Sequence, residues 1–135
     1  MGELKVASSL RNGEEEGEFF CLIQKTLEKI GENGVDIDDI MDNVIFVFHT
    51  KPAITRGTES RSVIASFNLS SLKKDIEKNG KNFGERAMDI IAHECAHYVK
   101  DHYKPEIFLK KGPSKCDEEA DDLIVEWGFN RAYTK

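Results

Sequence analysis

The pentad His93-Glu94-Cys95-Ala96-His97 constrains this chain more than any other stretch. On an α-helix, two histidines four residues apart lie one turn above each other on the same face, so both imidazoles can reach one metal ion. Glu94 lies beside them, where a carboxylate can act on a water next to that ion. In a chain with four histidines, such a pentad arises by chance in well under about one sequence in a hundred. The spacing therefore predicts a helical metal site that carries its own base.

The residues around the pentad favour a helix that is largely buried. Its flanks are apolar on both sides, with Ala87, Met88, Ile90, Ile91 and Ala92 before it and Tyr98 and Val99 after it. We expect one helix from about Phe83 to Asp101, which Pro105 ends. The alternative is a core helix on which two histidines stand at this spacing by accident.

The rest of the chain predicts a small α+β domain spanning residues 1–135. Apolar positions recur at three and four residues from Glu14 to Ile30, as in an amphipathic helix. Two runs, Val44 to His49 and Arg61 to Leu69, read as strands. A short helix from Ser70 to Lys78 precedes the pentad helix, and Gly112-Pro113 introduces a final helix that extends to about Ala132.

From these elements we expect a short mixed β-sheet packed against the N-terminal helix, the pentad helix and an acidic C-terminal helix. Residues 1–13 lack periodicity and are predicted to form a flexible arm or a short edge segment.

Composition limits the cellular setting and the partners. The formal net charge of −6 disfavours binding of nucleic acid by the whole surface. No stretch is apolar enough to span a bilayer, and three cysteines at spacings that fit no thiolate zinc site suit a reducing compartment. We therefore expect a cytoplasmic protein without a membrane span; the sequence leaves its oligomeric state open. One local exception to the acidic character is a group of lysines after the pentad, for which a solvated loop is the favoured interpretation: Lys100, Lys104, Lys110, Lys111 and Lys115.

Catalytic zinc usually takes three protein ligands, so the two histidines need a partner. His102 lies at a spacing that, on a continuing helix, would direct it away from the face shared by His93 and His97. The acidic run from Asp117 to Asp122 is the better source of a third ligand. Helical projection puts Asp117 at the border of the apolar face of the final helix, whereas Glu118 has the longer reach. Both stay open, and only one of these two carboxylates is expected to bind.

The pentad followed by Asp117-Glu118-Glu119-Ala120-Asp121-Asp122 resembles the gluzincin group of metallopeptidases. The pattern is similar to the small members, including the ImmA/IrrE-like and HtpX-like peptidases and the single-domain minigluzincins, over the stretch from His93 to Phe129. The resemblance implies a zincin-like fold in which a downstream helix supplies a carboxylate ligand. It also implies that an acidic residue one turn later, Asp121 or Asp122, orients a zinc-bound histidine. The chain departs from the family pattern because alignment on Ala120-Asp121 puts Asp117 where the family usually has Glu.

These residues predict a zinc-dependent endopeptidase with one Zn²⁺ per chain. Zinc would lower the pKa of a bound water, and Glu94 would accept its proton as general base during attack on a peptide carbonyl. Tyr98, His102 and Tyr103 are candidates for stabilising the transition state. We expect a protein or peptide substrate and limited or regulatory proteolysis. The alternatives are a zinc-binding regulatory or interaction module without proteolytic activity, and a metal-free interaction protein.

Overall fold

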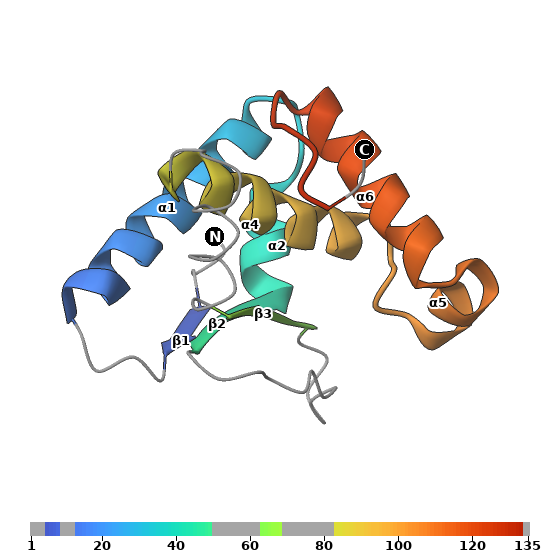
Figure 1. The fold of residues 1–135 in the computed structure, drawn as a ribbon, viewed down its shortest axis with the longest axis horizontal. Helices are drawn as coiled ribbons and strands as arrows, with labels where there is room; N and C mark the ends of the chain where they lie inside the picture. Colours follow the sequence, from blue (N-terminus) through green and yellow to red (C-terminus); the bar gives the residue numbers. More distant parts are fainter. Residues whose placement is uncertain (1–4, 9–12, 50–62, 69–82, 134–135) are drawn as a thin grey trace.

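The computed structural model describes residues 5–8, 13–49, 63–68 and 83–133 (Figure 1). Its strands and helices within those ranges are β1 (Lys5–Ser8), α1 (Gly13–Gly31), α2 (Ile37–Asn43), β2 (Val44–His49), β3 (Val63–Asn68), α4 (Phe83–Val99), α5 (Pro105–Lys111) and α6 (Pro113–Glu126). The predicted helix from Ser70 to Lys78 falls outside the described residues.

The expectation of an α+β fold with a mixed sheet is wrong. Helix dominates the described residues, with helices of 19, 7, 17, 7 and 14 residues against strands of 4, 6 and 6. The strands lie in the order β1-β2-β3, and both pairings are parallel. The chain passes through α1 and α2 between β1 and β2, and such a crossover returns it to the sheet in the same direction. Strand propensity located β2 and β3 but carries no information on their direction.

Lys5–Ser8, within the segment expected to be a flexible arm or a short edge segment, pairs with β2 as an edge strand. The stretch after Pro105, predicted to be a loop, forms α5, because proline is favoured in the first turn of a helix. Gly112, with φ of 83°, then turns the chain directly into α6, which ends at Glu126 rather than near Ala132.

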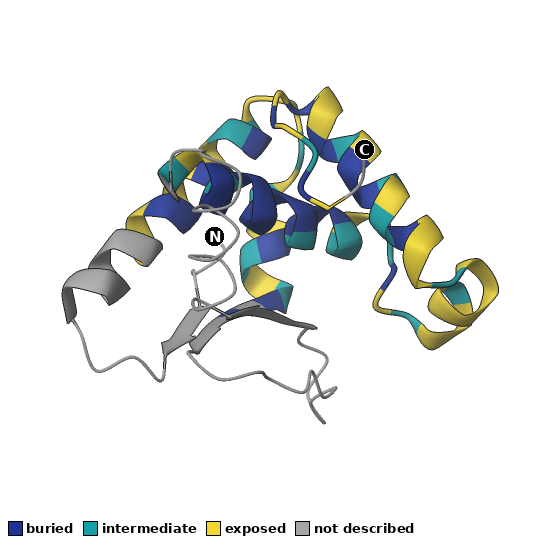
Figure 2. Ribbon diagram, viewed as in Figure 1, coloured by how far each residue is buried: buried dark blue, intermediate teal, exposed yellow. Residues whose placement is uncertain are grey.

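Helix α4 is the centre of the fold, with α1, α2, α6 and β3 in contact with it (Figures 1 and 2). Fully buried apolar side chains from several elements surround it: Ile23 and Ile30 of α1, Ile40 of α2, Phe46 of β2 and Ile124 of α6. Burying each such side chain contributes about 1.5–3 kcal/mol. The core therefore holds the pentad helix from several sides.

Small side chains set the approach of α6 to α4. Ala92 and Ala96 of α4 and Ala120 of α6 are all fully buried. Because an alanine adds only one methyl group, the two helix backbones can come close together. This contact brings the first half of α6 to the histidine face of α4.

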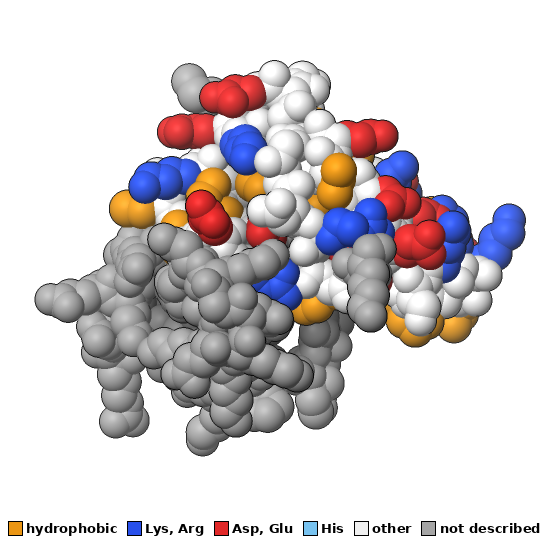
Figure 3. Space-filling view, turned by 45° about the horizontal axis from the view of Figure 1, so that its top comes forward, with side chains coloured by type: hydrophobic (Ala, Val, Ile, Leu, Met, Phe, Trp, Pro, Cys, Tyr) orange, Lys and Arg blue, Asp and Glu red, His pale blue; other side chains and the backbone are white. Residues whose placement is uncertain are grey.

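On the face of the molecule shown in Figure 3, charges of both signs are mixed among the described residues. Two lysines of the group after the pentad lie beside carboxylates: Lys111 Nζ is 2.7 Å from Glu119 Oε1, and Lys104 Nζ is 3.5 Å from Asp101 Oδ1. These ion pairs offset part of the positive charge of the lysine group. Separately, no helix in the described ranges is both long and apolar enough to cross a membrane.

Candidate metal centre

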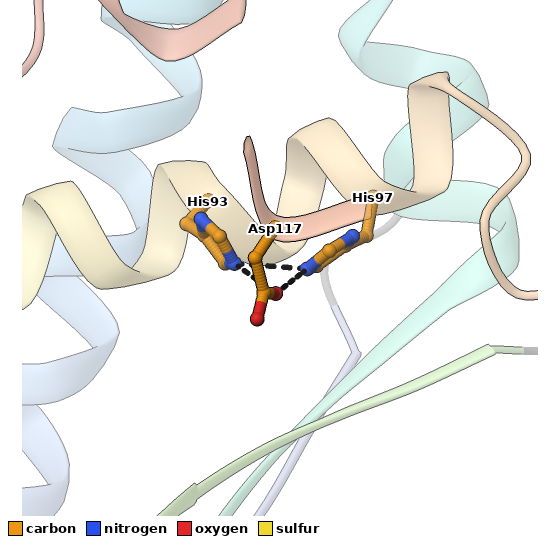
Figure 4. Close-up of side chains that lie close together, drawn as sticks. All are labelled: His93, His97 and Asp117. Atoms are coloured by element: carbon orange, nitrogen blue, oxygen red, sulfur yellow. Dashed lines mark hydrogen bonds and ion pairs between the residues drawn. The ribbon is translucent and has the colours of Figure 1, made fainter. Parts of the chain in front are cut away.

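Three ligand atoms from two helices meet at one point (Figure 4). His93 Nε2 and His97 Nε2, from successive turns of α4, lie 2.8 Å apart. Asp117 Oδ1, from the first half of α6, lies 3.2 Å from His93 Nε2 and 3.1 Å from His97 Nε2. The pentad and one carboxylate of the acidic run therefore form a group that could hold a metal ion.

The dimensions of this group fit a small cation. Zinc–nitrogen and zinc–oxygen bonds of about 2.0–2.1 Å in a tetrahedral site separate neighbouring ligand atoms by about 3.3 Å, close to the distances found. His93, His97 and Asp117 would thus hold the ion, and three protein ligands are the number that catalytic zinc sites use.

Asp121 fixes the orientation of His93. The Asp121 side chain is fully buried, and its Oδ1 lies 2.8 Å from His93 Nδ1. The same carboxylate accepts hydrogen bonds from the backbone N–H groups of Ala132 at 2.8 Å and Tyr133 at 3.0 Å. Since an ionised carboxylate can only accept, His93 donates from Nδ1 and directs the lone pair of Nε2 towards Asp117.

The end of α4 places His102 beside His97. Asp101 adopts a φ of 61°, the His102 N–H donates to the His97 carbonyl at 2.9 Å, and the Asp101 N–H donates to the Tyr98 carbonyl at 3.0 Å. These are the two hydrogen bonds of a Schellman motif, which reverses the chain at a helix end. As a result His102 is buried, with its Nδ1 2.8 Å from His97 Nδ1, rather than directed away from it.

Burial changes the proton affinity of two pentad residues in useful directions. Removal from water raises the pKa of the Glu94 carboxyl from 4.5 to about 7; protonation of His93 would oppose this shift, and the charge of Asp117 adds to it. Burial, with repulsion from His93 when that ring is protonated, lowers the pKa of His97 to about 4, so the His97 imidazole is neutral at pH 7. A neutral imidazole can bind metal, and a carboxyl with a pKa near 7 suits a general base.

The remaining predicted site residues lie away from the three ligand atoms. Glu118 is exposed and does not belong to the group formed by His93, His97 and Asp117. Asp122 is also exposed, and Arg131 Nη1 donates to its Oδ1 at 2.6 Å. Of the two acidic residues predicted to orient a histidine, Asp121 therefore contacts one, whereas Asp122 contacts Arg131.

The candidate transition-state donors have other partners. The rings of Tyr98 and Tyr103 stack with centroids 5.5 Å apart, and the Tyr98 hydroxyl donates to Asp39 Oδ2 at 3.1 Å. Both ring nitrogens of His102 are in contact with side chains, Nδ1 with His97 and Nε2 with Glu119 at 3.2 Å. In this arrangement neither Tyr98 nor His102 has a free donor for an oxyanion.

Two residues near the site were missed by sequence reasoning. Glu119 binds His102 and Lys111, and the hydrogen bond from Lys111 lowers the pKa of the Glu119 carboxyl. The Tyr133 ring packs edge-on against the His93 ring, with centroids 4.7 Å apart. Within an acidic run Glu119 resembles a solvated side chain of a helix surface, and nothing local to Tyr133 signals a contact 40 residues away in the chain.

Comparison of the chain with protein-family models, with curated proteins and with solved structures found no match. The function is therefore inferred from the geometry of the site and from the pentad.

In metal-free protein, Glu94→Gln is expected to gain stability relative to wild type as the pH rises from about 4.5 to 7. The unfolded Glu94 releases its proton near 4.5 and the folded one near 7, so the contribution of Glu94 to the wild-type free energy of unfolding falls across this window. Glutamine carries no such proton, and the difference should reach at most about 3 kcal/mol. The check is urea unfolding of both proteins in chelator at the two ends of the window.

His97 acts in the opposite direction. Its folded pKa is below its unfolded value of 6.5, so it adds stability that is lost as the pH falls from about 6.5 to 4. Because both proteins contain His97, its contribution largely cancels in the comparison. A difference between the two proteins that stays constant with pH would contradict the raised pKa of Glu94.

Proposed function

We propose that this chain is a zinc-dependent peptidase. The observation that carries the proposal is the convergence of His93 Nε2, His97 Nε2 and Asp117 Oδ1 within 3.2 Å of one another, with both histidines on the helix that also bears Glu94. Two imidazoles and one carboxylate are the ligand set of several catalytic zinc sites, which keep a fourth position for water or substrate. Structural zinc sites instead tend to use four ligands and to include cysteines.

The chain's own residues have distinct roles in this proposal. Zinc, when bound, supplies a Lewis acid that polarises the substrate carbonyl and acidifies water. Glu94 accepts a proton from the attacking water and later delivers it to the leaving amine, for which a pKa near 7 is favourable. Asp121 holds His93 in the tautomer and orientation that a ligand requires.

The resemblance of the pentad and the acidic helix to gluzincins supports the same reaction class. Under this proposal the substrate is a protein or peptide, cleaved at limited sites, in the cytoplasm. The alternative, a zinc-binding regulatory module, uses the same three ligands. It leaves Glu94 without a role, because a purely structural ion does not need a general base.

The zinc-loaded protein is expected to cleave members of an unstructured peptide library, detected by mass spectrometry. Activity should fall to background after treatment with 1,10-phenanthroline and return when about one equivalent of Zn²⁺ is added, because zinc supplies both the electrophile and the acidified water. Cleavage that persists in chelator would point to a contaminating or metal-independent protease. Zinc binding without cleavage across the library would favour the regulatory module.

A further inference from the structure

A series of hydrogen bonds begins at the ring nitrogen of His97 that faces away from Asp117. His97 Nδ1 lies 2.8 Å from His102 Nδ1, and His102 Nε2 lies 3.2 Å from Glu119 Oε1. Lys111 Nζ, at the end of α5, donates to the same Glu119 oxygen at 2.7 Å. His102 is buried, Glu119 is largely shielded from solvent and Lys111 is exposed. The series of hydrogen bonds therefore connects the site to the surface.

The chemical groups of Lys111 and Glu119 fix the direction in which each hydrogen bond of the series is donated. An ammonium group has only donors, and a carboxylate has only acceptors, so Glu119 accepts from both Lys111 and His102. A neutral His102 must then carry its proton on Nε2, which leaves Nδ1 as an acceptor. His97 therefore donates from its own Nδ1 and keeps a lone pair on Nε2.

This proton arrangement bears directly on the metal centre. His93 also keeps its lone pair on Nε2, because Asp121 accepts from its Nδ1. Two nitrogen lone pairs and the Asp117 carboxylate then face one another within 3.2 Å, with no hydrogen-bond donor among these three atoms. Three acceptors so close together repel one another, and a cation between them would satisfy all three.

We infer that His102, Glu119 and Lys111 form a positioning relay that holds His97 in the tautomer and orientation needed for metal binding. This inference deepens the proposed function and rests on its metal centre, but it does not require peptidase activity. Metal-bound histidines commonly donate their second ring N–H to a carboxylate or a backbone carbonyl. Here a buried second histidine takes that place and passes the interaction on to a carboxylate of α6 and a lysine of α5.

The first test measures zinc affinity by competition with a chromophoric chelator. His102→Leu keeps an apolar side chain of moderate size but removes the acceptor, and it should weaken zinc binding about 10–100-fold. His102→Gln, which can accept with its carbonyl and donate with its amide, should restore affinity to within a few-fold of wild type. Lys111→Met should cost only a few-fold because this lysine is exposed, and Lys110→Met is the matched control on the same helix.

Urea unfolding of the metal-free variants separates positioning from folding. A purely structural role for His102 would lower the stability of His102→Leu and leave the zinc affinity of the folded fraction unchanged, and that result would overturn the relay. Equal zinc affinities for His102→Leu, His102→Gln and wild type would also overturn it.

The second test reads the protons directly. Long-range ¹H–¹⁵N correlation spectra report which ring nitrogen of each histidine is protonated, with or without zinc. The relay predicts a proton on Nε2 of His102 and on Nδ1 of His97 in both states; a proton on Nδ1 of His102 would overturn it. If wild type binds no zinc but shows the predicted tautomers, the metal centre fails and with it the role of the relay in metal binding. If wild type binds zinc without cleaving peptides, only the peptidase proposal fails.

Discussion

Glu94→Gln is expected to lower kcat/KM for peptide hydrolysis by about 10²–10⁴-fold while the zinc content stays the same. Glutamine has nearly the shape of glutamate but cannot accept the proton that the attacking water must lose. Because none of the three proposed ligands changes, metal binding should survive. The measurement pairs initial rates on the best peptide of the library with zinc content by elemental analysis.

Glu85→Gln is the matched control, because it makes the same chemical change at an exposed position in the first turn of the same helix. Its kcat/KM should stay near the wild-type value. A Glu94→Gln protein that retains both zinc and full activity would exclude Glu94 as the general base. Loss of zinc together with activity would show instead that Glu94 supports the site itself.

Removing one ligand is the second change with a large expected effect. Wild-type protein should bind about one Zn²⁺ per chain, and His97→Ala and Asp117→Ala should each weaken binding at least about 100-fold. Each substitution deletes one of the three atoms that converge on the proposed ion position. Glu118→Ala, adjacent to Asp117 on α6 but exposed, should bind zinc like wild type. Elemental analysis after dialysis and a competition titration provide the two measurements.

The pair Asp117→Ala and Glu118→Ala decides between the two carboxylates that the sequence left open. Loss of zinc in the Glu118 variant alone would mean that α6 is rotated on α4 in the metal-bound protein. Absence of zinc from wild type after reconstitution would overturn the metal centre. Circular dichroism of each variant guards against the simpler explanation that a substitution prevents folding.

The sequence alone could not decide whether Asp117 or Glu118 is the third ligand. Neighbouring residues on a helix point about 100° apart, so Asp117 and Glu118 cannot both face α4. Their neighbours in sequence differ little in character, and helical projection favours Asp117 only weakly. The burial of Ala120 and Ile124 against the core sets the rotation of α6, and that rotation directs Asp117 towards the histidines.

The direction of the His102 side chain is a second feature that was predicted wrongly from the sequence. Its predicted direction assumed that the helix continues through Asp101, whereas α4 ends at Val99. The reversal depends on a positive φ at Asp101, a conformation that glycine would have signalled and aspartate does not. Strand direction is a third case, because a parallel pairing follows from the crossover through α1 and α2 rather than from any residue of the strands.

Features that depend on local geometry could be predicted from the sequence alone. The pentad predicts that His93 and His97 share a face, because an α-helix repeats every 3.6 residues whatever surrounds it. Apolar periodicity likewise predicted the helices that became α1 and α4. Tertiary structure alone decided which carboxylate meets the histidines, which group supports each of them, and in which direction the strands run. Those outcomes depend on contacts between residues far apart in the chain, and local propensity does not encode them.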